Sequence, residues 1–169
     1  PEGQPIEQAA DEADAVRQNI KTFIDHGVRR ILVSSPHCLH TFRNEYPEFM
    51  VHFEVVHLAE LLAELLQSGR LVLRQAVPGR VTFHDPCYLG RYAGTVDEPR
   101  ALLARVGGDV AEPERNRENP YCCGAGGGRM WMEEKEGKRI NIERAEEALA
   151  TEAGSIAVAC PFCMRSEEH

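Results

Sequence analysis

Apolar residues recur at two different spacings along the chain, and these spacings predict the order of helices and strands. Helical spacing, with an apolar side chain every three or four positions, is found in residues 10–26, 57–67, 97–106 and 138–152. Short apolar runs typical of buried strands occupy residues 30–34, 81–84 and 155–159, and a weaker run begins at Val110. We expect one more helix over residues 39–46, with a polar, irregular lead-in over residues 1–10. Asp97 is the expected N-cap of the helix over residues 97–106.

Helices that alternate with strands predict an α/β fold with short, largely parallel sheets. Three cysteines, Cys38, Cys87 and Cys160, each follow a predicted strand within a few residues. Ligand sites in parallel sheets lie beyond the carboxyl ends of the strands. We therefore expect the cysteines on loops at the C-terminal ends of the strands, on one face of one sheet.

Two segments of the chain resemble each other, which suggests two related α/β half-domains. Residues 30–39 read RILVSSPHCL and residues 155–164 read SIAVACPFCM, each an apolar run followed by a proline and a cysteine. Ser35 stands where the second copy has Cys160. We expect an incomplete first half-domain over residues 1–75 and a complete, cysteine-rich one over residues 76–169.

The composition and charge of the chain argue against several classes of function. The formal net charge is −8, and no basic patch or stripe suggests a nucleic-acid binder. No stretch approaches the roughly 18 apolar residues that would span a membrane, and the charged first 30 residues are not a secretory signal. We expect a cytoplasmic location, with membrane association only through a partner or a further domain. The start at Pro1 and the end shortly after Cys163 suggest a piece of a longer protein.

The spacing of five of the six cysteines is the strongest chemical signal in the sequence. Cys87 is followed, after residues 88–121, by the adjacent pair Cys122 and Cys123, and then by Cys160 and Cys163 in a Cys-x-x-Cys arrangement. Iron–sulfur clusters are held by cysteine thiolates, and adjacent cysteines can reach two different irons more easily than one tetrahedral metal. The glycine-rich run after the pair, with Gly124, Gly126 and Gly127, would let the backbone approach a cofactor closely and aim N–H groups at it.

Other roles for these cysteines stay open at this point. They could be buried structural residues, ligands of a structural zinc ion in a scaffold between redox partners, or a metal-free redox pair at Cys160 and Cys163. The absence of a secretory signal argues against a disulfide framework. The adjacent cysteine pair favours iron.

Several neighbouring residues are candidates for supporting roles. His84 and Asp85 precede Cys87 and could donate protons, whereas His37 and His40 more simply hydrogen-bond to backbone. Cys38 is not expected to be a ligand. Basic residues that could offset the charge of a thiolate cage are Arg91, Arg129, Lys138 and Arg139. Met130, Trp131 and Met132 could cover the site or face a partner.

These motifs resemble the cysteine-rich CCG domain family. The matching residues are HDPCYLGR at 84–91, YCCGAGGGR at 121–129 and ACPFC at 159–163. The family includes the catalytic subunits of heterodisulfide reductases, the iron–sulfur subunits of glycolate and lactate oxidases, and membrane-bound oxidoreductases of electron-transfer flavoprotein.

The resemblance implies an oxidoreductase domain that moves electrons through an iron–sulfur cluster. Its ligands would be Cys87, Cys122, Cys123, Cys160 and Cys163, and the cluster would be of the [4Fe-4S] type or a non-cubane relative of it, at which heterodisulfide reductases cleave a disulfide. The implied partners are ferredoxin-type iron–sulfur, flavoprotein or membrane quinone modules. The family's long members usually carry two copies of the motif, and the first copy is incomplete here.

Overall fold

The computed structural model describes residues 4–76, 78–132 and 137–167. Its α-helices are α1 (Gln4–Asp25), α2 (Pro36–His40), α3 (Leu58–Gln67), α4 (Asp97–Arg105), α5 (Ile140–Leu149) and α6 (Pro161–Glu167). Its strands are β1 (Arg30–Val33), β2 (Glu54–His57), β3 (Arg80–His84), β4 (Asp109–Ala111) and β5 (Ser155–Val158). Two π-helical turns, η1 (Thr41–Glu45) and η3 (Tyr88–Tyr92), and two 3-10 turns, η2 (Tyr46–Phe49) and η4 (Gly126–Trp131), complete the described elements.

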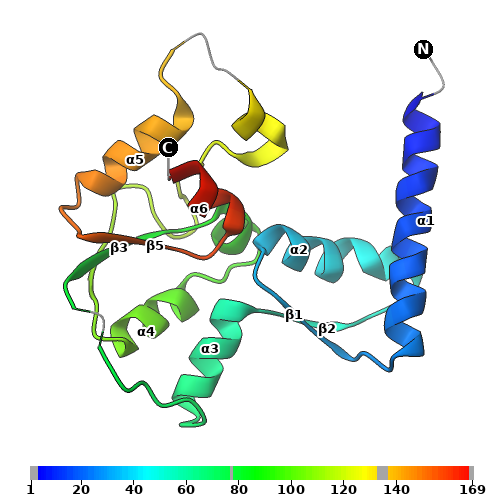
Figure 1. Ribbon diagram of the computed structural model, residues 1–169, viewed down its shortest axis with the longest axis horizontal. Coiled ribbons are helices and arrows are strands. Elements are labelled where there is room, and N and C mark those ends of the chain that lie inside the picture. The colour runs from blue at the N-terminus through cyan, green and yellow to red at the C-terminus, as the bar shows by residue number, and fades with distance from the viewer. Residues whose placement is uncertain (1–3, 77, 133–136, 168–169) are drawn as a thin grey trace.

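Every strand pairing in the described residues is parallel, which confirms the predicted α/β class. The strands form two sheets rather than one: β1 pairs with β2, and β3 lies between β4 and β5. The expectation of one sheet was therefore wrong, and Cys38 follows a strand of the smaller sheet. In Figure 1, α5 and α6 lie on one side of the larger sheet, and α3 and α4 lie on the other.

The repeated sequence segments adopt the same local structure. Strand β1 leads into α2, which starts at Pro36, and strand β5 leads into α6, which starts at Pro161. Proline suits this position because the first helical N–H has no intrahelical partner to lose. The rings of His37 and Phe162, at equivalent positions of the two copies, lie 5.2 Å apart. The two copies therefore face each other.

Some predicted boundaries differ from the observed ones. Helix α1 already includes residues 4–9, whose Gln, Glu and Ala are good helix formers. The predicted helix over residues 39–46 is instead α2 followed by η1 and η2, because Pro47 interrupts the helical hydrogen bonding. Strand β2 was not predicted, since only Val55 and Val56 of its four residues are apolar.

Two more elements were placed imperfectly. Asp97 is not an N-cap: it lies inside the first turn of α4, and its carboxylate pairs with Arg117 at 2.9 Å. Helix α5 is shorter than predicted, since it begins at Ile140 and ends at Leu149. Both differences are local and leave the order of elements unchanged.

One hydrophobic core joins the two sheets and positions the cysteine loops. Its buried members are Val33, Leu39 and Val55, from the half with the smaller sheet, and Leu89, from the turn after Cys87. Leu39 and Leu89 are completely buried, and α2 packs against η3. This packing holds the residues that follow β3 against those that follow β1.

Candidate functional site

All five cysteines of the predicted motif line one cavity of about 220 Å³. Gly124 and Gly126 line it as well, and Gly127 does not. The remaining wall residues are His37, Pro86, Tyr88 and Phe162. Cys38 is exposed and does not line the cavity.

Neighbouring strands bring Cys87 and Cys160 together. His84 at the end of β3 is paired in register with Val158 at the end of β5. Cys87 comes three residues after His84, and Cys160 comes two residues after Val158. Parallel strands end at the same edge of a sheet, so both thiols reach that edge.

Two of the five cysteines lie at the start of helical turns rather than on open loops. Cys87 is the residue that precedes η3, and Cys163 lies inside α6, one helical turn after Cys160. The amide of Met164 donates to the carbonyl of Cys160 at 3.1 Å, which closes this turn. The prediction of loop cysteines is therefore correct for Cys122, Cys123 and Cys160, which lie outside regular elements. It is wrong for Cys38 in α2 and for Cys163 in α6.

The loop that carries Cys122 and Cys123 is held from three directions. The Ser166 hydroxyl donates to the carbonyl of Cys123 at 2.5 Å, and Arg91 donates to the carbonyl of Pro120 at 3.2 Å. The amide of Gly124 donates to the sulfur of Cys122 at 3.3 Å. Gly124 has a φ of +79°, and a Cβ there would lie 3.1 Å from Ile140. Glycine is required at this position for both reasons.

The five thiols form one continuous series of hydrogen-bonded contacts. The order is Cys87, Cys122, Cys123, Cys163 and Cys160. Hydrogen bonds from Cys123 and Cys87 lower the pKa of Cys122 to about 2, and a hydrogen bond from Cys163 lowers the pKa of Cys160 to about 7.

The other three thiols are shifted in the opposite direction. The hydrogen bond to Cys122 raises the pKa of Cys123 to about 11, and contacts with Cys122 and Cys123 raise the pKa values of Cys87 and Cys163 respectively. Five thiolates this close repel one another, so ionisation of all of them requires a cation among them. The donor set fits a thiophilic metal centre.

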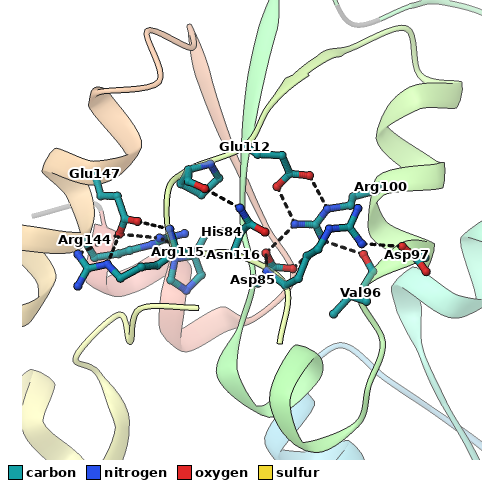
Figure 2. Close-up of polar contacts among 12 residues, drawn as sticks. His84, Asp85, Val96, Asp97, Arg100, Glu112, Arg115, Asn116, Arg144 and Glu147 are labelled. Atoms are coloured by element: carbon teal, nitrogen blue, oxygen red, sulfur yellow. Dashed lines mark hydrogen bonds and ion pairs between the residues drawn. The ribbon is translucent and has the colours of Figure 1, made fainter. Parts of the chain in front are cut away.

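The two residues predicted as proton donors face different surroundings. His84 is buried, and one of its ring nitrogens lies within 4.8 Å of the sulfur atoms of Cys123 and Cys163. Asp85 instead accepts hydrogen bonds from both Nη atoms of Arg100, each at 2.8 Å, and from the amide of Arg117 at 2.7 Å. Figure 2 shows Asp85 and its contacts with Arg100.

Sequence reasoning missed the aromatic part of the cavity wall. His37 lies in α2, its ring is 4.1 Å from the Tyr88 ring, and burial, with a smaller contribution from His40, lowers its pKa. It is therefore a cavity residue and not a loop histidine. The internal repeat was the available signal, because it aligns His37 with Phe162 beside Cys163.

Arg144 was also missed. It is completely buried, and its Nε lies 2.7 Å from Nδ1 of His84. Ile140, Arg144 and Ala148 recur every four residues along α5, so the helical period places Arg144 on the face of the helix that packs inward. That period was the signal in the sequence.

The basic residues proposed to offset the site's charge have other contacts. Lys138 pairs with Glu146, and Arg91 donates to backbone carbonyls. Arg129 and Arg139 line a separate cavity of about 210 Å³, together with Arg165 and Gly124.

Met130 and Trp131 differ in their surroundings. Met130 packs against the cluster formed by Cys123, Cys160 and Cys163, whereas Trp131 is 80% exposed. Of the three residues expected to cover the site, Met130 therefore contacts its buried cysteines, whereas Trp131 and Met132 are exposed. Within the part of the chain that is described, no helix is both long and apolar enough to cross a membrane.

Comparison with known proteins agrees with this site. The cysteine-rich domain model named CCG matches residues 3–43 and 81–166. A probable iron–sulfur-binding oxidoreductase FadF of Bacillus subtilis is 45% identical over 152 residues, which are 89% of this chain and 22% of that protein. An EtfAB:quinone oxidoreductase of Syntrophomonas wolfei is 42% identical over 156 residues, which are 88% of this chain and 22% of that protein.

A more distant relative belongs to the dihydromethanophenazine:CoB–CoM heterodisulfide reductase of Methanosarcina mazei. This component of the reductase is 32% identical over 157 residues, which are 90% of this chain and 38% of that protein. The chain thus spans well under half the length of these relatives. The family match covers both copies of the internal repeat and all five cysteines of the cavity. The resemblance seen in the sequence is confirmed: the chain belongs to the cysteine-rich CCG domain family.

Proposed function

We propose that this chain is the iron–sulfur-cluster-binding part of a heterodisulfide-reductase-like oxidoreductase and that it transfers electrons. The observation that carries the proposal is the meeting of Cys87, Cys122, Cys123, Cys160 and Cys163 around one cavity of about 220 Å³. The relatives, which are named as oxidoreductases and as a component of a heterodisulfide reductase, support the same conclusion.

The residues around the cavity fit such a group. Thiolate is the usual ligand of iron–sulfur clusters, and this cavity offers five thiols where a single cube takes four. Gly126 lines the cavity, and a Cβ added there would meet no protein atom within 4 Å. Gly124 and Gly126 would leave room for the cofactor and supply backbone N–H groups toward it, whereas Gly127 lies outside the cavity lining.

When bound, the cluster would supply reversible electron transfer; the chain's own residues would hold it, exclude water and tune it. The fifth thiol and the adjacent pair favour a [4Fe-4S]-type cluster of the non-cubane kind over a single cube. The wall of His37, Tyr88 and Phe162 gives the cavity an aromatic side. The proton-donor roles of His84 and Asp85 stay predictions.

The partners we propose are redox modules. One relative is named for an electron-transfer flavoprotein and a quinone, and another is named for a heterodisulfide. Attachment to a membrane would come through such a partner or a further domain.

A structural zinc ion is the second candidate, and one observation favours it. His84, Cys123 and Cys163 offer three ligand atoms that lie within 4.8 Å of one another, and zinc commonly takes nitrogen and sulfur ligands in a tetrahedral array. Under this alternative the chain would be a scaffold within a redox complex.

Iron, zinc and acid-labile sulfide analysis, with an EPR spectrum, would test the proposal on the chain reconstituted without oxygen. We expect several irons and sulfides per chain and a paramagnetic signal. The Cys123→Ser variant should lose most of this iron, because Cys123 is buried in the centre of the thiol series. The matched control is Cys38→Ser, whose thiol lies outside the cavity and should leave the iron content unchanged.

Two results would overturn the proposal. The first is a single zinc per chain with no sulfide, which would establish the scaffold alternative. The second is full iron binding by Cys123→Ser, which would overturn the assignment of the five cysteines as the cluster ligands.

A further inference from the structure

His84 lies close to both a buried arginine and two thiols of the proposed cluster site. It ends strand β3 and is 1% exposed. On one side its Nδ1 lies 2.7 Å from Nε of Arg144, as Figure 2 shows. A ring nitrogen also lies within 4.8 Å of the sulfur atoms of Cys123 and Cys163.

The contact with Arg144 fixes the direction of the hydrogen bond. An arginine Nε always carries a hydrogen and never accepts, because the guanidinium stays protonated in proteins. Nδ1 of His84 must therefore be the acceptor and carry no proton. The neutral imidazole has one N–H, so this N–H is on Nε2.

Arg144 is itself held in place from the opposite side. Its Nη1 donates to the carboxylate of Glu147 at 3.0 Å and to the carbonyl of Arg115 at 3.2 Å. The Arg144 side chain has no exposed surface, and Glu147 is 9% exposed. A planar guanidinium held at two points cannot turn away from His84 without leaving a buried charge unpaired.

We propose that Arg144 is a positioning residue that holds His84 as the Nε2–H tautomer, so that the imidazole donates a hydrogen bond to the sulfur atoms at Cys123 and Cys163. The proposal rests on the iron–sulfur function proposed above. A hydrogen bond to a ligand sulfur stabilises the more negative, reduced state of a cluster and raises its reduction potential. This role differs from that of a proton donor, because the Nε2 proton of His84 stays on the ring and is not transferred.

The first measurement needs no cluster. In the metal-free chain labelled with ¹⁵N-histidine, two-bond ¹H–¹⁵N correlation spectra show which ring nitrogen carries the proton, and the His84→Gln variant identifies the His84 signals. We expect the Nε2–H pattern in the unaltered chain. An Nδ1–H pattern, or protons on both nitrogens at neutral pH, would overturn the proposal.

The second measurement removes the arginine. In Arg144→Met the ratio of the Nε2–H to the Nδ1–H tautomer should fall by roughly ten- to a hundredfold, the factor expected for one hydrogen bond from a charged donor. Arg144→Lys keeps the charge without the Nε–H and should restore the ratio only in part. The matched control is Arg115→Met, because the Arg115 guanidinium pairs with the same Glu147 and otherwise with Glu143. An unchanged ratio in a folded Arg144→Met chain would overturn the proposal.

The third measurement uses the reconstituted chain. Arg144→Met and His84→Phe should both shift the cluster's reduction potential to more negative values, whereas Arg115→Met should not. An unchanged potential in both variants would overturn the tuning role. Failure to bind iron at all would instead refute the proposed function, and the tautomer result in the metal-free chain would still stand.

Discussion

Gly124 and Gly126 line the same cavity for different reasons. The backbone of Gly124 requires glycine, because its φ is positive and Ile140 lies against the position of a Cβ. Gly126 has no positive φ, and no atom of the described residues lies within 4 Å of an added Cβ. The protein alone therefore tolerates alanine at Gly126, and a cofactor in the cavity would not.

We predict that Gly126→Ala leaves the metal-free chain equally stable or stabilises it by about 0.4–1 kcal/mol, yet loses most of the iron after reconstitution. Denaturant unfolding and iron analysis measure the two effects separately. The contrasting variant is Gly124→Ala, which should destabilise the metal-free chain by about 1–2 kcal/mol because of its left-handed backbone. Full iron content in Gly126→Ala would contradict the assigned role.

Asp85 illustrates a residue whose sequence neighbourhood suggested chemistry and whose contacts are structural. Its carboxylate joins the end of β3 to α4 through Arg100 and to the loop at Arg117. Asp85 is 1% exposed, and Arg100 is 10% exposed. Arg100 also donates to both carboxylate oxygens of Glu112, at 2.6 and 2.8 Å, so it keeps one charged partner when Asp85 is lost.

Replacement of Asp85 by asparagine should therefore lower the free energy of unfolding of the metal-free chain by about 1–3 kcal/mol, because buried hydrogen bonds to a charged acceptor are lost. Asp14→Asn is the control, because the Asp14–Arg17 pair is well exposed, and its loss should change stability by less than about 0.5 kcal/mol. Urea denaturation followed by circular dichroism gives both values. Similar values for the two variants would show that the buried pair contributes no more than a surface pair.

At the scale of elements, the start of α3 depends on His57. Its Nδ1 accepts from the amide of Ala59 at 3.2 Å, and Glu60 accepts from the amide of His57 at 2.8 Å, which together form a capping box. Nε2 of His57 faces the carbonyl of Ser34 at 3.2 Å. Burial, as the largest cause, lowers the pKa of His57 below 6.5, although the Ser34 carbonyl and Glu60 oppose this shift.

This lowered pKa gives a pH dependence with a definite sign. The unfolded chain takes up the His57 proton near pH 6.5 and the folded chain only at lower pH, so protonation favours unfolding as pH falls through this window. We predict that stability declines below about pH 6.5 more steeply in the unaltered chain than in His57→Asn, in which asparagine caps the helix without titrating. Urea unfolding between pH 7 and 5 measures the slopes. Equal slopes would refute a contribution from His57.

At the scale of the whole molecule, the segment between α3 and β3 connects the parts of the chain that carry the two sheets. Residues 72–76 and 78–80 are exposed, and Arg70 is exposed near the start of the segment. The hydrophobic core nevertheless combines Val33, Leu39 and Val55 from one part with Leu89 from the other. We retain the division at residues 75 and 76 as a proposal about half-domains that share one core.

Brief trypsin treatment should cut this connection first, at Arg70 or Arg74, and the two pieces should stay together on size-exclusion chromatography. They should remain associated because buried apolar contacts cross the division. Arg100 and Arg144, which are buried, should resist cleavage under the same conditions. Separation of the pieces without denaturant would show that the half-domains do not share a core.

The sequence by itself determined the α/β order, the repeat and the five clustered cysteines. Each depends on short-range information. The spacing of apolar residues identifies strands and helices, and the cysteines come directly after predicted strands or next to glycines. Parallel strands then bring such residues to a shared edge whatever the details of packing.

The tertiary structure alone decided which other side chains reach the site. Packing of α2 on η3 added His37 and Tyr88 to the cavity, and the division into two sheets left Cys38 outside it. Residues 60 positions apart formed the His84–Arg144 contact. Local sequence patterns contain no information about such pairs, because long-range packing of α5 against the larger sheet determines which side chains come into contact.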